Sequence, residues 1–106
     1  MTITHINNVT EFHNLINNDH RTIFVKYSTT RCAPCRALAP VYEEYAGASD
    51  EIVFAEVDAG KASDVAQLCG ISAVPTIQIY LNKIMLEEIV GVSKTKLGEI
   101  VRKYTK

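Results

Sequence analysis

One stretch of the chain decides its fold: Thr22-Ile-Phe-Val-Lys-Tyr-Ser-Thr-Thr-Arg-Cys-Ala-Pro-Cys-Arg36. Residues 22–28 are mostly apolar and rich in β-forming side chains, which is typical of a short strand buried on both faces. Lys26 is the one charged residue among them. After residue 31, apolar side chains recur at helical spacing. A buried strand therefore passes directly into a helix, and two cysteines lie at the junction.

The spacing of these two cysteines predicts redox chemistry. Cys32 and Cys35 are three residues apart at the start of a helix, so their sulfurs share a face and can form a disulfide with little backbone movement. A thiolate at a helix N-terminus is stabilised by free amide groups and by the helix dipole. Cys32 occupies that place and Cys35 lies one turn inside. We therefore expect Cys32 to attack a substrate and Cys35 to resolve the intermediate.

Metal binding and core packing are two alternative roles for the cysteine pair. A Cys-x-x-Cys motif can be half of a zinc site, but Cys69 is a single further thiol and no second ligand pair has zinc spacing. We therefore expect no metal. In the second role both cysteines would be inert core residues. Two cysteines on either side of a proline are poorly placed to fill a core.

The rest of the chain alternates helices with strands. In the third helix, which Ser63 is expected to cap, Val65, Leu68 and Cys69 are expected to face inward. Strands linked by helices favour a partly parallel sheet covered on both faces, with an antiparallel hairpin at one edge. We expect one α/β domain over residues 1–106, a three-layer α/β/α sandwich with a central mixed sheet of four to five strands. The expected helices follow Asn8, follow Arg31, begin at Ser63 and begin at Ser93, and the expected strands cover residues 22–28, 52–58, 76–81 and 84–90, with a further short strand around residues 2–5.

The composition excludes several classes of protein. The chain has 106 residues, 47% of them hydrophobic, which suffices for one domain with its own core. Its 11 Lys and Arg residues and 12 Asp and Glu residues give a net charge of −1, too little to attract nucleic acid or an anionic membrane. No apolar run reaches the roughly 18 residues of a membrane helix. The first residues lack the pattern of a signal peptide, and the cysteine count of 3 is odd, so we expect an intracellular protein.

Several motifs occur together in this chain: Cys32-Ala-Pro-Cys35-Arg36 followed by Pro40, then Glu56-Val-Asp58, Val74-Pro75-Thr76 and Gly91. Together they resemble the thioredoxin family. The resemblance covers about residues 6–104 and implies the thioredoxin fold, with reduction of protein disulfides as the activity. It also implies a cytoplasmic monomer without a bound cofactor. Its partners would be disulfide-containing proteins and an NADPH-dependent thioredoxin reductase.

The resemblance also implies a groove for the substrate. In the family, the proline that matches Pro75 follows a cis peptide bond and packs beside the cysteines. Carried over, Ala73, Val74 and Gly91 would line a groove that holds an extended segment of the partner by β-type hydrogen bonds. The alternative is that Pro75 is an ordinary proline at the first residue of a strand.

Two departures from the family pattern lie next to the cysteines. The usual tryptophan before the first cysteine is Arg31, and the usual glycine between the cysteines, before Pro34, is Ala33. Together with Arg36, Arg31 places two cations near Cys32, which favours its thiolate and a more oxidising cysteine pair. The alternative is that both arginines are solvated and screened.

A third departure concerns the buried charge behind the cysteines. The family usually has a buried aspartate at position 26 and commonly a lysine at position 56, whereas this chain has Lys26 and Glu56. A buried ammonium needs a partner, so we expect an ion pair between Lys26 and Glu56 behind Cys35. Glu56 or water would then accept the proton of Cys35. The alternative is that Lys26 extends its stem to solvent and has no role.

Two further functions remain open at this point. A disulfide oxidase or isomerase is favoured by the cations around Cys32 and disfavoured by the missing signal peptide. A non-catalytic binding module with the thioredoxin fold is supported only by the substituted positions, and the two intact cysteines speak against it.

Overall fold

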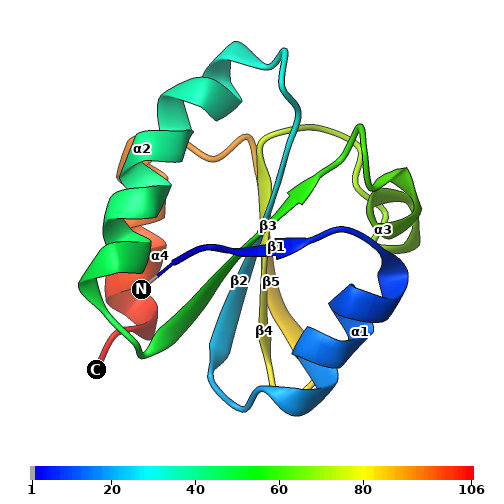
Figure 1. Cartoon of the computed structure of the whole chain (residues 1–106). Coiled ribbons are helices and arrows are strands. Elements are labelled where there is room, and N and C mark those ends of the chain that lie inside the picture. The colour runs from blue at the N-terminus through cyan, green and yellow to red at the C-terminus, as the bar shows by residue number, and fades with distance from the viewer. Residues whose placement is uncertain (1) are drawn as a thin grey trace.

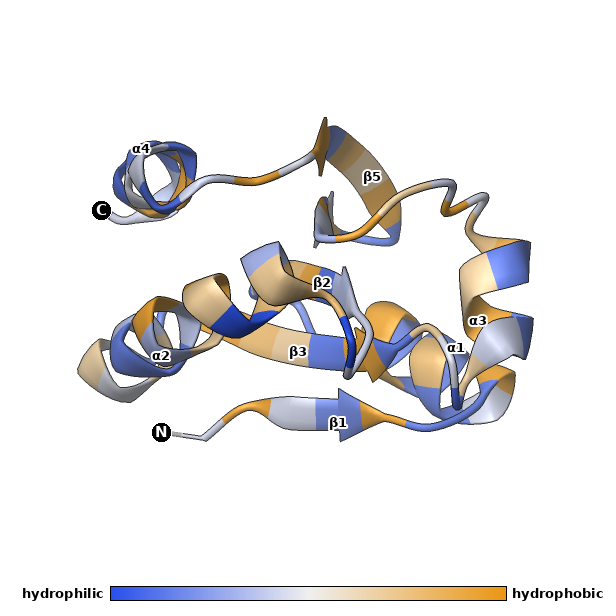
Figure 2. Cartoon of the chain, turned by 90° about the horizontal axis from the view of Figure 1, so that it is seen from above, coloured by the Kyte–Doolittle hydropathy of each residue, from blue (hydrophilic) through white to orange (hydrophobic). Residues whose placement is uncertain are grey.

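A central five-stranded sheet separates two pairs of helices (Figure 1). The computed structural model describes residues 2–106. Seen from above, α2 and α4 lie on one side of the sheet and α1 and α3 on the other (Figure 2). The expected three-layer sandwich is therefore confirmed. The strands are β1 (Thr4–Ile6), β2 (Thr22–Ser28), β3 (Ile52–Asp58), β4 (Thr76–Leu81) and β5 (Ile84–Val90), and the helices are α1 (Val9–Asn18), α2 (Ala33–Ala48), α3 (Ser63–Leu68) and α4 (Lys94–Tyr104).

The sheet is mixed and has the order β1-β3-β2-β4-β5. Strands β1, β3 and β2 run parallel, while β4 is antiparallel to β2 and β5 is antiparallel to β4. Because β2 is central, side chains on both of its faces are covered. Within residues 2–106, no helix has the length and apolar character needed to cross a membrane.

The alternation of side chains along β2 divides the core into two clusters. Ile23, Val25 and Tyr27 pack with residues of α1 and α3. Phe24 points to the opposite face and packs with residues of α2 and α4. Lys26 follows on the face of Phe24, so its ammonium group enters the apolar layer between the sheet and α2.

Helix α3 differs from the expectation in two ways. Its N-cap is Ala62 rather than Ser63, with no side-chain cap, and Leu68 is 53% exposed rather than inward. The buried stripe of this short helix runs through Ala62 and Val65 to the half-buried Cys69. At 100° per residue Leu68 falls outside that stripe.

A small polar cluster connects β5 to α4. Glu87 on β5 accepts a hydrogen bond from Lys103 Nζ at 2.8 Å and another from the hydroxyl of Tyr104. The hydrogen bonds from Lys103 and Tyr104 hold the pKa of Glu87 below its ordinary value of 4.5. Because the pKa of Glu87 is lower in the folded state than in the unfolded state, its ionised form stabilises the fold at pH values above the unfolded-state pKa. This stabilisation is lost as the pH falls through the folded-state pKa.

Glu87→Gln tests this connection. At neutral pH we expect a loss of about 0.5 kcal/mol in the free energy of unfolding, because the cluster is solvent-screened. The difference from wild type should vanish well below pH 4.5, where Glu87 is protonated in both states. Urea denaturation at the two pH values measures it. An equal difference at both values would show that the carboxylate charge contributes nothing.

Candidate active site

The two cysteines form a disulfide at the start of α2. Their Cα atoms are 5.2 Å apart. Cys32 is the N-cap residue of the helix, and its Sγ accepts a hydrogen bond from the backbone amide of Cys35 at 3.2 Å. Cys32 is half-buried, whereas Cys35 is only 3% exposed. A partner can therefore approach the sulfur of Cys32 but not that of Cys35.

The loop before β4 lies against the disulfide. The Val74–Pro75 peptide bond is cis, and the carbonyl oxygen of Val74 is 3.9 Å from Cys32 Sγ. The amide of Gly91 donates to the carbonyl of Pro75 at 2.9 Å, which places the start of the β5–α4 connection beside the same loop. Ala73 is exposed there. The residues expected to line the groove are thus brought together beside Cys32.

The residues next to the two cysteines are exposed, and two of them belong to the first turn of α2. Ala33 and Pro34 form the first turn of α2, where a missing amide proton breaks no helical hydrogen bond. Arg31 and Arg36 are both exposed. Arg36 Nη1 donates to the carbonyl of Thr30 at 3.0 Å, which holds its guanidinium over the segment that leads into Cys32.

The two residues with exchanged charges, Lys26 and Glu56, form an ion pair behind the disulfide. Lys26 on β2 and Glu56 on β3 are register partners in the parallel pair, and Lys26 Nζ lies 3.2 Å from Glu56 Oε2. The Lys26 side chain is 1% exposed and that of Glu56 is 26% exposed. The ammonium therefore does not reach solvent, in contrast to the alternative in which its stem extends outward.

Tyr42 of α2 completes the surroundings of the ammonium. Lys26 Nζ lies 4.6 Å from the centre of the Tyr42 ring, a favourable position for a cation. The Tyr42 hydroxyl is within hydrogen-bond distance of the carbonyls of Phe24 (3.2 Å) and Ala55 (2.7 Å). Burial raises the pKa of Tyr42, so it remains a neutral donor. The helical spacing after residue 31 places Tyr42 among the apolar residues of α2, but it does not show which strand residue Tyr42 contacts.

A cavity of about 170 Å³ lies behind the disulfide. Cys35, Lys26, Glu56 and Asp58 are among the residues that line it. A cavity of this size has room for water. The buried sulfur and the ion pair therefore face a common space through which a proton can pass between them.

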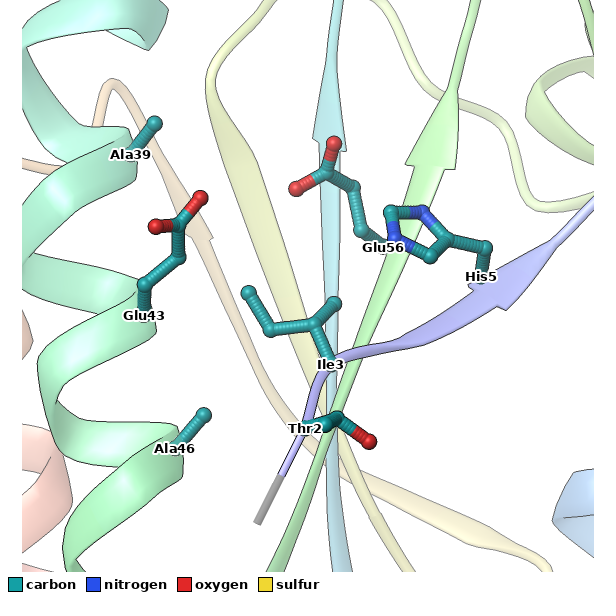
Figure 3. A pocket seen from close by; sticks show the side chains of 7 residues that line it. All are labelled: Thr2, Ile3, His5, Ala39, Glu43, Ala46 and Glu56. Carbon is teal, nitrogen blue, oxygen red and sulfur yellow. The ribbon is translucent and has the colours of Figure 1, made fainter.

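Glu56 also lines a second cavity, of about 400 Å³, between β1 and α2. Figure 3 shows the side chain of Glu56 beside the ring of His5, with Glu43 across the cavity on α2. His5 and Glu56 are register partners on parallel strands. Sequence reasoning missed this second cavity, because the contact between β1 and β3 depends on a strand order that the local pattern does not contain.

Comparison with known proteins identifies the family. The thioredoxin family model matches residues 3–103. The chain belongs to the thioredoxin family. It is 36% identical to a thioredoxin of Coprinus comatus over 92% of this chain and 93% of that one. It is 35% identical to a thioredoxin of Ophiophagus hannah over 93% of this chain and 95% of that one.

The likeness extends to the three-dimensional structure. A solved structure of Plasmodium falciparum thioredoxin superimposes with a TM-score of 0.91 at 26% identity, covering 97% of this chain and 100% of that one. Members of the thioredoxin family are oxidoreductases that reduce protein disulfides through a Cys-x-x-Cys pair. The Cys32–Cys35 disulfide is consistent with that activity, so the chain is a thiol–disulfide oxidoreductase.

Proposed function

We propose that this thioredoxin-family oxidoreductase works through Cys32 as the nucleophile and Cys35 as the resolving thiol. The observation that carries the proposal is the difference in exposure between the two cysteines of one disulfide: Cys32 is half-buried at the N-terminus of α2 and Cys35 is buried. The free amides of the helix start favour the thiolate of the exposed residue. The substrate would bind along Ala73, Val74 and Gly91.

The reaction then runs in two exchanges. The Cys32 thiolate attacks one sulfur of the substrate disulfide, a Cys32–substrate disulfide forms, and the second substrate sulfur leaves as a thiolate. Cys35 loses its proton and attacks Cys32 Sγ, which forms the Cys32–Cys35 disulfide and releases the first substrate sulfur. Two electrons have passed from the protein to the substrate. A reductase must return them before the next turnover.

Glu56 is proposed as the acceptor of the Cys35 proton, directly or through water. Both residues line the 170 Å³ cavity, and Lys26 keeps Glu56 oriented through the 3.2 Å ion pair. A carboxylate in this place can take the proton and pass it to solvent through the second cavity, which it also lines. Lys26 is a positioning residue in this scheme.

The remaining parts of the proposal concern the cellular setting. We propose one thioredoxin domain over residues 1–106, acting as a monomer in the cytoplasm on disulfide-containing proteins and recycled by an NADPH-dependent thioredoxin reductase. In this role it contributes to electron transport and redox homeostasis. The chain has a free thiol, that of Cys69, in addition to the redox-active pair, and this supports a reducing compartment, where unpaired cysteines persist.

Turnover with a protein disulfide tests the proposal. Wild-type protein at catalytic concentration should accelerate the reduction of insulin by NADPH and a thioredoxin reductase, followed by the absorbance of NADPH as it is consumed. Equilibration with dithiothreitol shows in parallel whether the Cys32–Cys35 disulfide forms and breaks. A pair that cycles with dithiothreitol but gives no reduction of insulin would favour the binding module over the reductase.

A further inference from the structure

The segments that surround the disulfide carry charge of one sign. Four segments meet at this end of the sheet: residues 29–37, 59–63, 70–75 and 91–98. Backbone hydrogen bonds place them together, since the Ala59 amide donates to Ser28 at 2.8 Å and the Gly91 amide donates to Pro75 at 2.9 Å. These segments contain no aspartate or glutamate. Their basic residues are Arg31, Arg36, Lys61, Lys94 and Lys96, all exposed.

The carboxylates that directly adjoin these segments are those of Asp58, Asp64 and Glu99, and the first two accept hydrogen bonds from backbone amides. Asp58 accepts hydrogen bonds from the amides of Gly60 at 2.9 Å and Lys61 at 3.1 Å. Asp64 accepts from the amides of Val9 at 3.3 Å and Val65 at 2.9 Å. Both hold backbone groups of their own surroundings rather than side-chain cations.

The basic side chains are mostly unneutralised. Lys96 lies 3.7 Å from Glu99. Over the described residues 2–106, none of the other four has a carboxylate within salt-bridge distance. We call these five basic residues the positive rim. The whole chain has a net charge of −1, so acidic residues elsewhere in the chain offset the charge of the rim.

We propose that the preferred substrates present their disulfide in an extended segment flanked by aspartate or glutamate. The inference rests on the proposed function, because it names the substrate class of the same groove. Opposite charges around two approaching groups raise the rate of encounter and exclude partners of the same charge. Because the basic residues lie on several sides of Cys32, they attract acidic side chains both before and after the substrate cysteine. A partner with basic residues at those places would instead meet repulsion.

Three peptides test the inference. The three peptides have the same sequence except at the residues that flank their single cysteine, which are Glu, Gln or Lys. In each peptide this cysteine forms a disulfide with the same small thiol. Stopped-flow measurement with the reduced protein gives the second-order rate constant of each. At low ionic strength we expect the Glu peptide to react about 10-fold faster than the Lys peptide, with the Gln peptide between them. At about 1 M salt the three rates should converge.

Matched charge reversals connect the effect to the rim. Lys61→Glu combined with Lys94→Glu should remove or invert the preference for the Glu peptide. Lys83→Glu makes the same kind of charge change at the β4–β5 turn, at the opposite end of β4, and should leave the preference as in wild type. The ratio of the Glu and Lys rate constants cancels any change in the reactivity of Cys32 itself.

The outcomes separate the acidic-substrate inference from the proposed reductase activity. Equal rates for the three peptides, or a preference that survives the double reversal, overturn the acidic-substrate inference while leaving the reductase intact. Failure to reduce even the Gln peptide overturns the proposed function and the inference with it.

Discussion

Cys32→Ser is expected to abolish disulfide reduction, with a loss of at least about three orders of magnitude in the turnover rate. A serine hydroxyl remains protonated where the thiol ionises, and it cannot form a disulfide with the substrate. Cys35→Ser should also stop turnover, but at a later step. Its Cys32 still attacks, and the mixed disulfide persists because no thiol is left to resolve it.

Mass spectrometry distinguishes these outcomes after incubation with a disulfide-containing protein. The Cys35→Ser variant should accumulate the adduct and the Cys32→Ser variant should not. Cys69→Ser is the matched control, since this half-buried thiol lies outside the site and its loss should leave turnover within about twofold of wild type. Adducts on Cys35 in the Cys32→Ser variant, at the wild-type rate, would contradict the assigned roles.

Glu56→Gln is expected to have the second-largest effect, on both stability and rate. The substitution leaves the Lys26 ammonium, which is 1% exposed, with an amide in place of a carboxylate, so we expect a loss of about 1–3 kcal/mol in the free energy of unfolding. The attack of Cys35 should slow about 10- to 100-fold near neutral pH, because its proton loses the proposed acceptor. Asp58, the other carboxylate of the cavity, is held by the backbone amides of Gly60 and Lys61. Lys26→Met should cost less stability, since the half-exposed Glu56 still reaches water.

The double variant Lys26→Met with Glu56→Gln separates the two effects. Removing both charges leaves no buried ion without a partner, so stability should recover toward wild type. The rate of the resolving step should remain low, because the Glu56 carboxylate is still absent. Urea denaturation measures the first quantity, and the pH profile of single-turnover mixed-disulfide resolution measures the second. Recovery of the rate together with stability would show that Glu56 has a structural role only.

The sequence predicted the layers and the cysteine pair because each depends on a local pattern. The nearly continuous apolar run of β2 and the helical spacing after residue 31 are each visible within one element. The two cysteines needed only their spacing and their place before a helix. The Lys26–Glu56 contact was predictable because the family resemblance implies opposite charges at these two positions, and a buried ammonium needs a partner.

Features that depend on contacts between elements were less accessible. The error at Leu68 arose because a six-residue helix contains too few turns to fix its inward face from periodicity. The position of Tyr42 under the Lys26 ammonium requires the packing angle of α2 on the sheet, which no local pattern contains. The second cavity beside Glu56 depends on β1 pairing with β3 rather than with β2.

The exchange of charge between positions 26 and 56 has an evolutionary consequence. Starting from an aspartate at 26 and a lysine at 56, changing either position alone to its present residue would put two like charges in register where the present pair is 3.2 Å apart. One of them would lie in a site that is 1% exposed, so such an ancestor would fold poorly. A viable history passes through an uncharged residue at one position. The two sites are therefore coupled, and neither can reverse its charge while the other stays fixed.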